Sequence, residues 1–335
     1  MAKTVDEIAK DLGVSITTVR AVLNGNAGKY RISLATQEKI NQYVKQHSYT
    51  INLTARSLKL NKSNIFGLVI PRLSNPFFSA LAEQLEASCR ELGYQLMISC
   101  SNGDAHYENL LVKSLEERNV DGIFIAATEA ACQAHHLKHR KKALVFLDRD
   151  FAIKNATCVT TDNSDSGYRL TRAMLEYTSK SIYFFVADPS SPTIIDRLSG
   201  FHRAMAEQGI TVPDTDITYA EHNRISDGAS LMAQFIDRHQ CWPQNFIASS
   251  LPVLQGALSV LRERYGYIPN DINIGTFDDN IMLSFLANNI WSMRQNEKQL
   301  VEKACQLMIG KLEGSVSKSS ATAKAELIFR QRKSG

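Results

Sequence analysis

The sequence lacks the features that mark membrane, secreted and disulfide-stabilised proteins. None of its apolar runs approaches the roughly 20 residues that cross a bilayer, and its N-terminus has no apolar signal core. Its six cysteines form no CxxC pair, and most lie in apolar segments, which predicts buried free thiols in a reducing compartment. We therefore expect a cytoplasmic protein with no membrane partner.

Motifs of enzymes are missing as well. The sequence has no GxGxxG or GxxxxGK[ST] nucleotide fingerprint and no GxSxG nucleophile elbow. His135, His136 and His139 cluster on one helical segment, but no acid or cysteine completes a metal-ligand set at the usual spacing, so a solvated basic helix is expected there. The sequence therefore predicts no enzyme, no catalytic residue, no metal site and no cofactor.

What the sequence does contain is an uneven distribution of charge. Its length of 335 residues predicts about two or three domains. Residues 1–62 hold ten Lys or Arg and four Asp or Glu, whereas the remainder holds 28 basic and 30 acidic residues. A basic head on a nearly neutral body is typical of a nucleic-acid-binding module attached to another domain.

Residues 4–20, TVDEIAKDLGVSITTVR, predict two helices joined by a tight turn. Gly13 stands where the turn needs a positive φ, and Ser15 is placed to cap the second helix. A basic loop with several Gly and Asn follows, and then a third helix from about residue 33 to residue 47. This pattern predicts a helix-turn-helix, whose second helix enters the major groove of DNA.

The first residues of that second helix are the ones that reach base edges in this geometry. Thr17 can bond a base or a phosphate, Ile16 can contact a thymine methyl, and Arg20 can reach guanine or phosphate. The full set of DNA contacts expected in the head is Thr4, Ser15, Ile16, Thr17, Thr18, Arg20, Lys29, Tyr30 and Arg31. A helical hairpin that binds protein is the alternative interpretation.

From residue 65 onward, short apolar runs alternate with helical segments. The expected strands lie at 65–70, 95–99, 122–126, 143–147, 158–161, 182–186, 246–249 and 272–276, with a last strand near 325–329. The expected helices lie near 77–92, 107–118, 132–140, 164–177, 195–208, 225–238 and 252–265. This alternation predicts an α/β body of two doubly wound halves with parallel sheets, and a ligand between them at the carboxyl ends of the strands.

Residues 4–19 and the VLN that follows at 22–24 resemble the head of the LacI–GalR family of sugar-responsive transcription regulators. The resemblance continues through ARSL at 55–58 and IFGLVIP at 65–71 to the C-terminus. The loop at 25–30, FDDN at 277–280 and RQN at 294–296 are similar to the sucrose and fructose operon repressors. The resemblance implies an all-α helix-turn-helix head and a two-lobed periplasmic-binding-protein-like body.

The resemblance also implies a hinge helix that pairs with a second copy in the DNA minor groove. Leu58 matches the leucine that wedges into a central base step and kinks the duplex, which costs unstacking energy but allows a wider contact. Ala55 is small enough for close approach of the two helices, and Arg56 and Lys59 can meet phosphates. Packing of Leu58 onto the body is the alternative. Residues 49–59 are too short and polar to form a stable helix alone.

In the body, the resemblance implies a sugar cleft. Phe77 would stack on a sugar ring, Asp148 and Asp278 would accept hydroxyls, and Arg149 and Arg197 would donate to hydroxyls or phosphate. The full set expected to bind the effector is Arg72, Phe77, Asp148, Arg149, Arg197, Ser250, Asp278 and Gln295. A structural salt bridge or cap is the alternative for each of them.

Two departures from the family pattern bear on the ligand. Ser249-Ser250 stands where the family often has an Asn-Asp or similar pair, so one hydroxyl-binding acid is missing. Arg72 and Ser74 precede Asn75, in a place where an acidic residue is common. Both departures favour a phosphorylated or furanose sugar, of the fructose, fructose 1-phosphate or sucrose type.

The expected organisation is a DNA-binding domain at 1–48, a hinge and linker at 49–62, and an effector-binding and dimerisation domain at 63–335. The N-lobe would comprise about 63–161 and 293–322, and the C-lobe about 162–292 and 323–332.

The expected function is repression of a carbohydrate operon by a homodimer that a sugar or sugar phosphate releases from operator DNA. The alternatives are a regulator with another effector or with activator output, and a sugar transport protein or sugar-modifying enzyme with an accessory basic head.

Replacement of Leu58 tests the hinge. We expect Leu58→Ala to lose specific operator binding and to keep the salt-sensitive binding to unrelated DNA, because only the wedge depends on the operator's central step. Binding to operator and random duplexes across a salt series measures both. Unchanged operator affinity would remove the wedge.

Overall fold

The computed structural model describes residues 4–23, 25–47, 62–178, 181–315 and 319–332. The chain divides into two compact units, Met1–Ser63 and Asn64–Gly335. No helix in the described ranges is long and apolar enough to cross a membrane.

The first unit is a three-helix head, α1 Val5–Leu12, α2 Ile16–Leu23 and α3 Leu34–Gln46. Gly13 ends α1 with φ of 67°, and the Ser15 hydroxyl accepts a hydrogen bond from the Thr18 N–H at 3.0 Å, so both predictions for the turn are confirmed. One core, contributed by all three helices and the loop between α2 and α3, holds the head together: Ile8, Ala9, Val19, Val22, Ala27 and Ile40.

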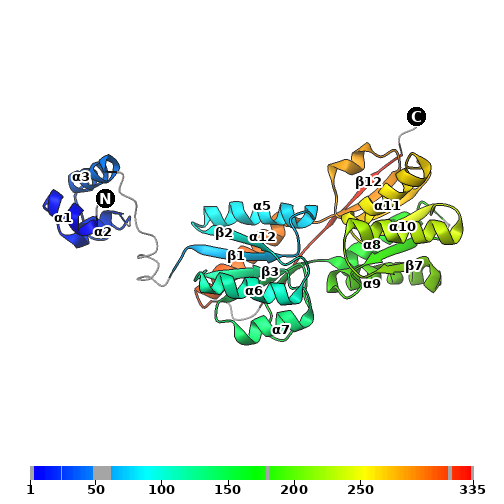
Figure 1. Cartoon of the computed structure of the whole chain (residues 1–335), viewed down its shortest axis with the longest axis horizontal. Coiled ribbons are helices and arrows are strands. Elements are labelled where there is room, and N and C mark those ends of the chain that lie inside the picture. The colour runs from blue at the N-terminus through cyan, green and yellow to red at the C-terminus, as the bar shows by residue number, and fades with distance from the viewer. Residues whose placement is uncertain (1–3, 24, 48–61, 179–180, 316–318, 333–335) are drawn as a thin grey trace. The chain divides into compact units, whose positions relative to one another are not determined.

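The second unit has two lobes, each built on a six-stranded sheet (Figure 1). The strands of the N-lobe sheet are β1 Ile65–Ile70, β2 Gln95–Cys100, β3 Gly122–Ile125, β4 Ala143–Leu147, β5 Cys158–Thr161 and β11 Ala321–Ala323. They are arranged in the order β11-β5-β4-β3-β1-β2, and all of them run parallel.

The C-lobe sheet has the order β12-β10-β9-β8-β6-β7. Its strands are β6 Tyr183–Ala187, β7 Ile217–Ala220, β8 Asn245–Ala248, β9 Asn273–Phe277, β10 Asn289–Arg294 and β12 Glu326–Arg330. The edge strand β12 runs antiparallel to β10, so this sheet is mixed, whereas its other pairs are parallel.

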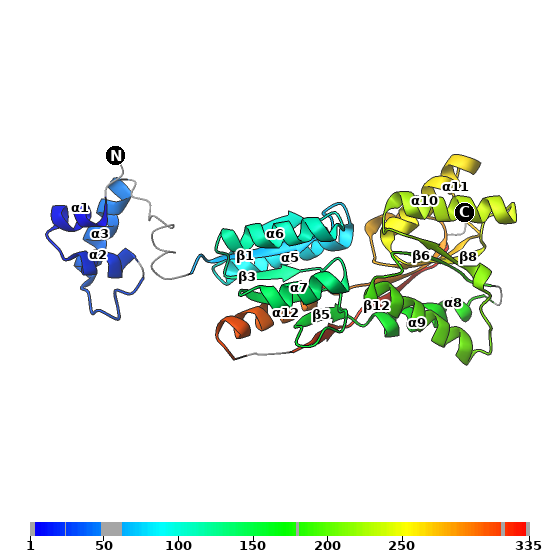
Figure 2. The same ribbon diagram turned by 60° about the horizontal axis from the view of Figure 1, so that its bottom comes forward.

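Helices cover both faces of each sheet (Figures 1 and 2). In the N-lobe, α5 Pro76–Glu91 and α12 Glu297–Leu312 pack on one face, and α6 Ala105–Glu117 and α7 Ala130–His139 pack on the other. In the C-lobe, α8 Asn163–Leu175 and α9 Pro192–Glu207 cover one face, and α10 Ile225–His239 and α11 Leu251–Tyr265 cover the other. Two 3-10 helices, η1 Asp214–Asp216 and η2 Ile281–Phe285, lie in connections.

The chain passes between the lobes three times: after β5, after β10 and between β11 and β12. Four strands and α-helices have no counterpart among those predicted above: β7, β10, β11 and α12. β7 has only four residues, and two of them are half-buried and one is exposed, so its apolar signal is weak. α12 does carry helical spacing, with Leu300, Val301, Ala304, Leu307 and Met308 buried, and this spacing could have identified it.

Glycines allow α8 and α9 to cross at very short range. A Cβ on Gly167 would lie 2.2 Å from the Arg197 carbonyl oxygen, and one on Gly200 would lie 2.1 Å from the Ser164 carbonyl oxygen. The helices α10 and α11 repeat this device with Gly228 and Gly256. The backbone that carries Arg197 is therefore held directly against α8.

We expect Gly167→Ala to lower the free energy of unfolding by about 2–3 kcal/mol, because a close-packed crossing cannot absorb a methyl group without moving a helix. Urea unfolding of the full chain measures the change. Gly28→Ala is the control, because it adds the same methyl group where nothing lies within 4 Å. Equal stabilities of the two variants would contradict the close crossing.

Candidate functional site

Three aspartates follow three strands at the facing ends of the two lobes. Asp148 follows β4, Asp188 follows β6 and Asp278 follows β9, with φ values of 65°, 58° and 70°. Aspartate tolerates this left-handed conformation because its short polar side chain can bond the local backbone. The same turn thus places a carboxylate beside the cleft in three places.

The cleft between the lobes has an inner and an outer part. The inner pocket has a volume of about 20 Å³, and the outer cavity has a volume of about 280 Å³, near the lower end of the range for small-molecule sites. Both are lined by Asn75, Phe78, Arg149 and Asn223, so they form one continuous cleft.

The structure brings the expected effector-binding residues together around this cleft. Those that line the inner pocket are Phe77, Asp148, Arg149, Arg197, Ser250, Asp278 and Gln295. Arg72 lines the outer cavity, where its guanidinium donates to the Asn102 carbonyl at 2.9 Å. These residues come from both lobes and from distant parts of the sequence, so only folding brings them to one cleft.

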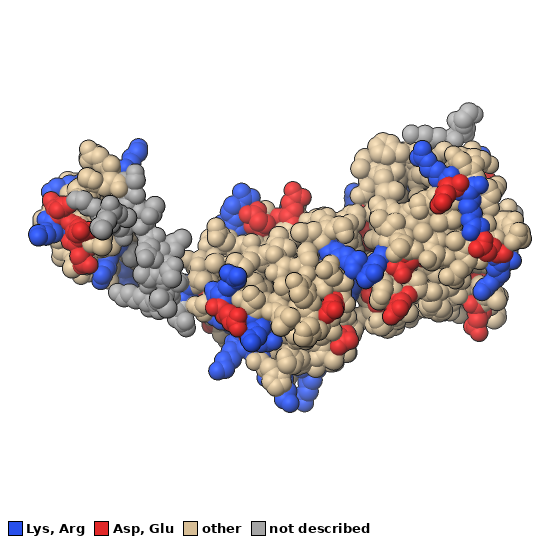
Figure 3. Space-filling view, viewed as in Figure 1, with Lys and Arg blue, Asp and Glu red and all other residues tan. Residues whose placement is uncertain are grey.

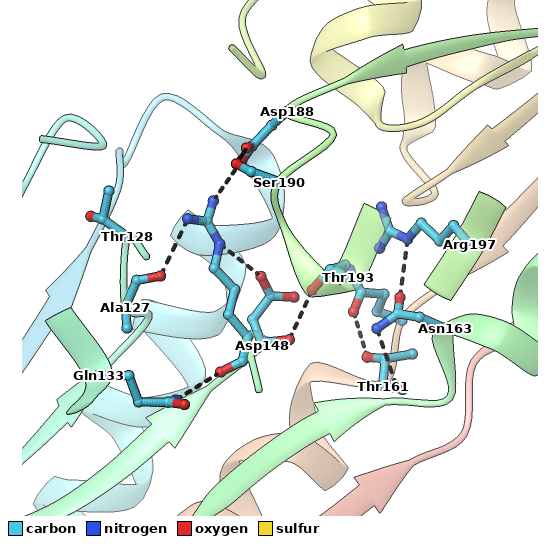
Figure 4. A network of polar contacts seen from close by, with 12 residues as sticks. Ala127, Thr128, Gln133, Asp148, Thr161, Asn163, Asp188, Ser190, Thr193 and Arg197 are labelled. Carbon is cyan, nitrogen blue, oxygen red and sulfur yellow. Dashed lines mark hydrogen bonds and ion pairs between the residues drawn. The ribbon is translucent and has the colours of Figure 1, made fainter. Parts of the chain in front are cut away.

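Arg197 is buried at the base of the inner pocket. Its Nε donates to Asn163 Oδ1 at 3.0 Å (Figure 4). Its Nη1 donates to the Ser249 carbonyl at 2.8 Å, and its guanidinium lies 4.4 Å from the centre of the Phe277 ring. Burial lowers the pKa of Arg197, while Asp278 and Asp148 raise it. The arginine is thus fixed in place by protein groups before any ligand binds.

Arg149 connects the two lobes across the cleft. Its Nη1 donates to the Ala127 carbonyl at 3.3 Å, and its Nη2 lies 3.5 Å from Asp188 Oδ2 in the C-lobe (Figure 4). Its buried Nε has no hydrogen-bond partner among the described residues and lies 3.8 Å from Asp148 Oδ2. The Nε of this cleft residue is therefore held only by the longer ion pair with Asp148.

The other polar groups of the inner pocket form short contacts. Gln295 Nε2 donates to Asp278 Oδ1 at 2.6 Å, and Gln295 Oε1 accepts from the Thr161 hydroxyl at 2.5 Å. The Ser250 hydroxyl donates to Asn223 Oδ1 at 2.5 Å and also caps α11. Each of these groups already has a hydrogen-bond partner in the protein. Each also has an oxygen or nitrogen atom that could form a further hydrogen bond to a ligand hydroxyl.

Phe77 and Phe78 are both buried in the core beneath α5. Phe77 reaches the inner pocket, as expected, but Phe78 lines both parts of the cleft. Phe78 therefore belongs to the core and to the lining of the cleft at once.

Several cleft residues were not predicted from the sequence. They include Asn75, Thr128, Asn163, Asp188, Thr193 and Arg224. Asp188 follows a strand in the same way as Asp148 and Asp278, and this position directly after a predicted strand is the signal that could have identified it. Thr193 donates its hydroxyl to the Asp148 carbonyl at 2.9 Å and ties α9 to the N-lobe, a contact that has no local sequence signal.

The histidine segment differs from its prediction. His136 is fully buried, and its Nε2 lies 2.9 Å from Glu108 Oε1, whose other carboxylate oxygen accepts from the Thr128 N–H. The segment is therefore not a solvated face throughout, because His136 packs α7 against α6. Within the described ranges, no cluster of His, Cys, Asp or Glu is able to hold a metal.

The side chains expected to read DNA lie at the start of α2. Ile16, Thr17 and Arg20 are exposed, whereas Thr18 is half-buried and bonds Ser15. In the following loop Lys29, Tyr30 and Arg31 are also exposed. These side chains are free to meet a partner.

Two predicted DNA contacts have structural roles as well. Thr4 forms a capping box with Glu7 at the start of α1, and Ser15 caps α2. Ala55, Arg56, Leu58 and Lys59 lie outside the residues that the structure describes.

The pKa of Asp148 predicts how stability depends on pH. Burial raises this pKa from 3.8 to about 6, against the opposing effect of Arg149 and Arg197. The folded protein therefore holds a proton that the unfolded chain releases, and this contribution is present below about pH 4 and lost as the pH rises through 6.

The contribution amounts to about 3 kcal/mol. We expect the unfolding free energy of Asp148→Asn, relative to the unmodified protein, to rise by about this amount between pH 4 and pH 8. Urea unfolding at both pH values measures it, and a constant difference would contradict the raised pKa.

Comparison with known proteins agrees with this architecture. Residues 4–52 match the model of the lacI family of bacterial regulatory proteins, and residues 66–315 match that of the periplasmic binding protein domain. The chain is 32% identical to the fructose operon regulatory protein of Vibrio cholerae, over 98% of this chain and 99% of the relative. It is 27% identical to the sucrose operon repressor of Klebsiella pneumoniae, over 93% of this chain and 92% of the relative.

A solved structure is similar too. The Cra transcriptional dual regulator from Pseudomonas putida, in complex with fructose 1-phosphate, superposes with a TM-score of 0.72 at 26% identity and covers 81% of this chain and 99% of its own. The predicted fold, and the predicted likeness to fructose and sucrose regulators, are confirmed. This chain belongs to the lacI family of bacterial regulatory proteins.

Proposed function

We propose that this protein represses a carbohydrate operon as a homodimer and leaves its operator when a fructose-type sugar phosphate binds between the lobes. The observation that carries the proposal is the cleft, in which carboxylates, arginines and amides from both lobes converge. The chain that forms this cleft also carries a helix-turn-helix head. A sensor and a DNA reader are thus joined in one polypeptide, which acts as a cytoplasmic regulator and not as an enzyme.

In this proposal the head comprises residues 1–48, the hinge and linker 49–62, and the sensor 63–335. The start of α2 reads base edges, with Ile16, Thr17 and Arg20 as its main contacts. The hinge adds Leu58 as a minor-groove wedge.

The charges of the cleft support a phosphorylated ligand. Asp148 and Asp278 suit sugar hydroxyls in the inner pocket, because ionised carboxylates accept two hydrogen bonds or more. The outer cavity adds Arg72, Arg149 and Arg224, whose guanidinium groups match phosphate geometry. The fructose 1-phosphate bound by the Pseudomonas relative has this chemistry.

Contacts between the lobes supply a means of control. Arg149 pairs with Asp188, and Thr193 donates to the Asp148 carbonyl, so N-lobe and C-lobe groups already meet at the cleft. A ligand that competes for these groups changes the relative free energies of the lobe arrangements. It weakens operator binding to the extent that its affinity differs between the DNA-binding and released states.

An exposed apolar surface on the C-lobe supports the homodimer. Ile281 and Phe285 on η2 are 73% and 80% exposed, which is unusual for such side chains. A helix-turn-helix head reads half-sites in pairs, so a second copy of this chain is the partner that both observations favour. The description of the Pseudomonas relative as a dual regulator favours activation as a second output at some promoters.

Titration of an operator with candidate effectors tests the proposal. The operator is first selected from random duplexes with the full chain, and its affinity is then measured with sucrose, fructose, fructose 1-phosphate and fructose 1,6-bisphosphate. We expect a fructose phosphate to lower the affinity at least tenfold. If none of the four changes it, the proposed effector class is wrong.

Arg197→Ala separates sensing from DNA binding. We expect unchanged operator affinity and a response to effector that needs at least tenfold more ligand, because a lost charge-assisted hydrogen bond costs about 1.5–3 kcal/mol. Arg197→Lys keeps the charge and reports on the guanidinium shape. Arg203→Ala, at an exposed position of the same helix, is the control and should respond normally. A normal response of Arg197→Ala would remove this residue from the site.

A further inference from the structure

A basic groove lies at the amino ends of the N-lobe strands, whereas the effector cleft lies at their carboxyl ends. It has a volume of about 460 Å³ and is found where β3 and β4 begin and where α7 and α12 end. Its charged lining consists of Arg140, Lys141, Lys142 and Lys311, with Asp121 as the single acid. In Figure 3, blue side chains also gather along the lower left margin of this lobe.

Protein groups neutralise only part of this charge. Arg140 pairs with Glu116 at 3.1 Å, whereas Lys142 Nζ donates to the uncharged Asn119 Oδ1 at 2.7 Å. Lys141 and Lys311 have no acidic partner among the described residues. The groove thus holds an excess of positive charge.

The environment of Lys311 disfavours its charged form. Its partial burial lowers its pKa, because the ammonium group loses water without gaining a carboxylate. Its place in the last turn of α12 is favourable for a cation, but a helix terminus contributes only about half a charge. An anion in the groove would offset what remains.

The position where the linker from the head joins the body indicates which anion could bind in the groove. The Asn64 N–H donates to Asp121 Oδ2 at 2.8 Å, and Asp121 lines the groove. Because β1 begins at the next residue, the chain enters the body at the end of the sheet where the groove lies. Residues 48–61, which lead to the head, can span at most roughly 50 Å. The length of this linker sets an upper limit on the distance between the groove and DNA bound by the head.

We propose that this groove, through Lys141, Lys142 and Lys311, binds the phosphate backbone of the DNA that flanks the operator. The inference rests on the proposed DNA-binding function and adds a second contact surface to it. Backbone phosphates need no base-specific partner, which suits a groove whose free groups are flexible ammonium ions. The groove would raise affinity at any sequence that flanks the operator.

This contact makes a quantitative prediction about salt. Each phosphate neutralised by a lysine adds about 0.9 to the slope of log affinity against log salt. Loss of Lys141 and Lys311 from both protomers should lower the slope on a long duplex by about 2–4, and the affinity at about 100 mM salt at least tenfold. A duplex that ends at the operator should show neither change.

The experiment compares full-length proteins on a selected operator with and without ten additional base pairs on each side. Lys141→Gln/Lys311→Gln should lose the preference for the long duplex. Lys298→Gln/Lys324→Gln is the matched control, because it removes the same charge at exposed positions near the other end of α12 and after β11. Lys141 lies in an exposed connection, so Lys141→Gln alone should fold normally. It should lose part of the preference for the long duplex, which shows that the effect of the double variant does not come from misfolding.

Two results would overturn the proposal: no preference of the unmodified protein for the long duplex, or an unchanged preference in the double variant. The second result would mean that the groove does not bind flanking DNA, and an acidic protein surface would then be the partner that its charge fits. In both cases binding to the short operator duplex would stay intact, so the proposed repressor function would survive. Failure to select any operator would instead refute that function.

Discussion

The cleft depends on one buried charge, the guanidinium of Arg197. A buried cation is costly unless it is paired and hydrogen-bonded. Here Asn163 and the Ser249 carbonyl accept its protons, the Phe277 ring lies beneath it, and Asp148 and Asp278 supply nearby negative charge. Each of these groups stands at the end of a strand or the start of a helix, so satisfying Arg197 fixes the mouth of the C-lobe sheet.

This constraint extends into the packing of the lobe. Arg197 keeps its place because α9 lies against α8 with only glycine between their backbones. α8 in turn carries Asn163 at its first residue, directly after a crossing from the N-lobe. The residues that hold the guanidinium therefore sit beside one of the three connections between the lobes. Under the proposed function, this places the ligand contacts and the lobe geometry in one network.

Local signals in the sequence predict most of the fold, because alternating apolar runs mark the parallel strands. The cleft residues, Asp148 and Asp278 among them, come instead from the resemblance to a known family, and the structure places both directly after strands. Asn163 and Thr193 were missed because their importance comes from partners distant in the sequence. His136 was misjudged for the same reason, since only the tertiary structure brings Glu108 to its ring.

The central claim is that effector and operator compete through the conformation of one body. Linkage requires that each ligand weaken the other by the same factor. The direct measurement is calorimetric titration of fructose 1-phosphate into the full chain, alone and saturated with its selected operator. The account predicts that operator lowers the effector's affinity by the factor, at least tenfold, by which effector lowers the operator's. Equal effector affinity in the two titrations would contradict it.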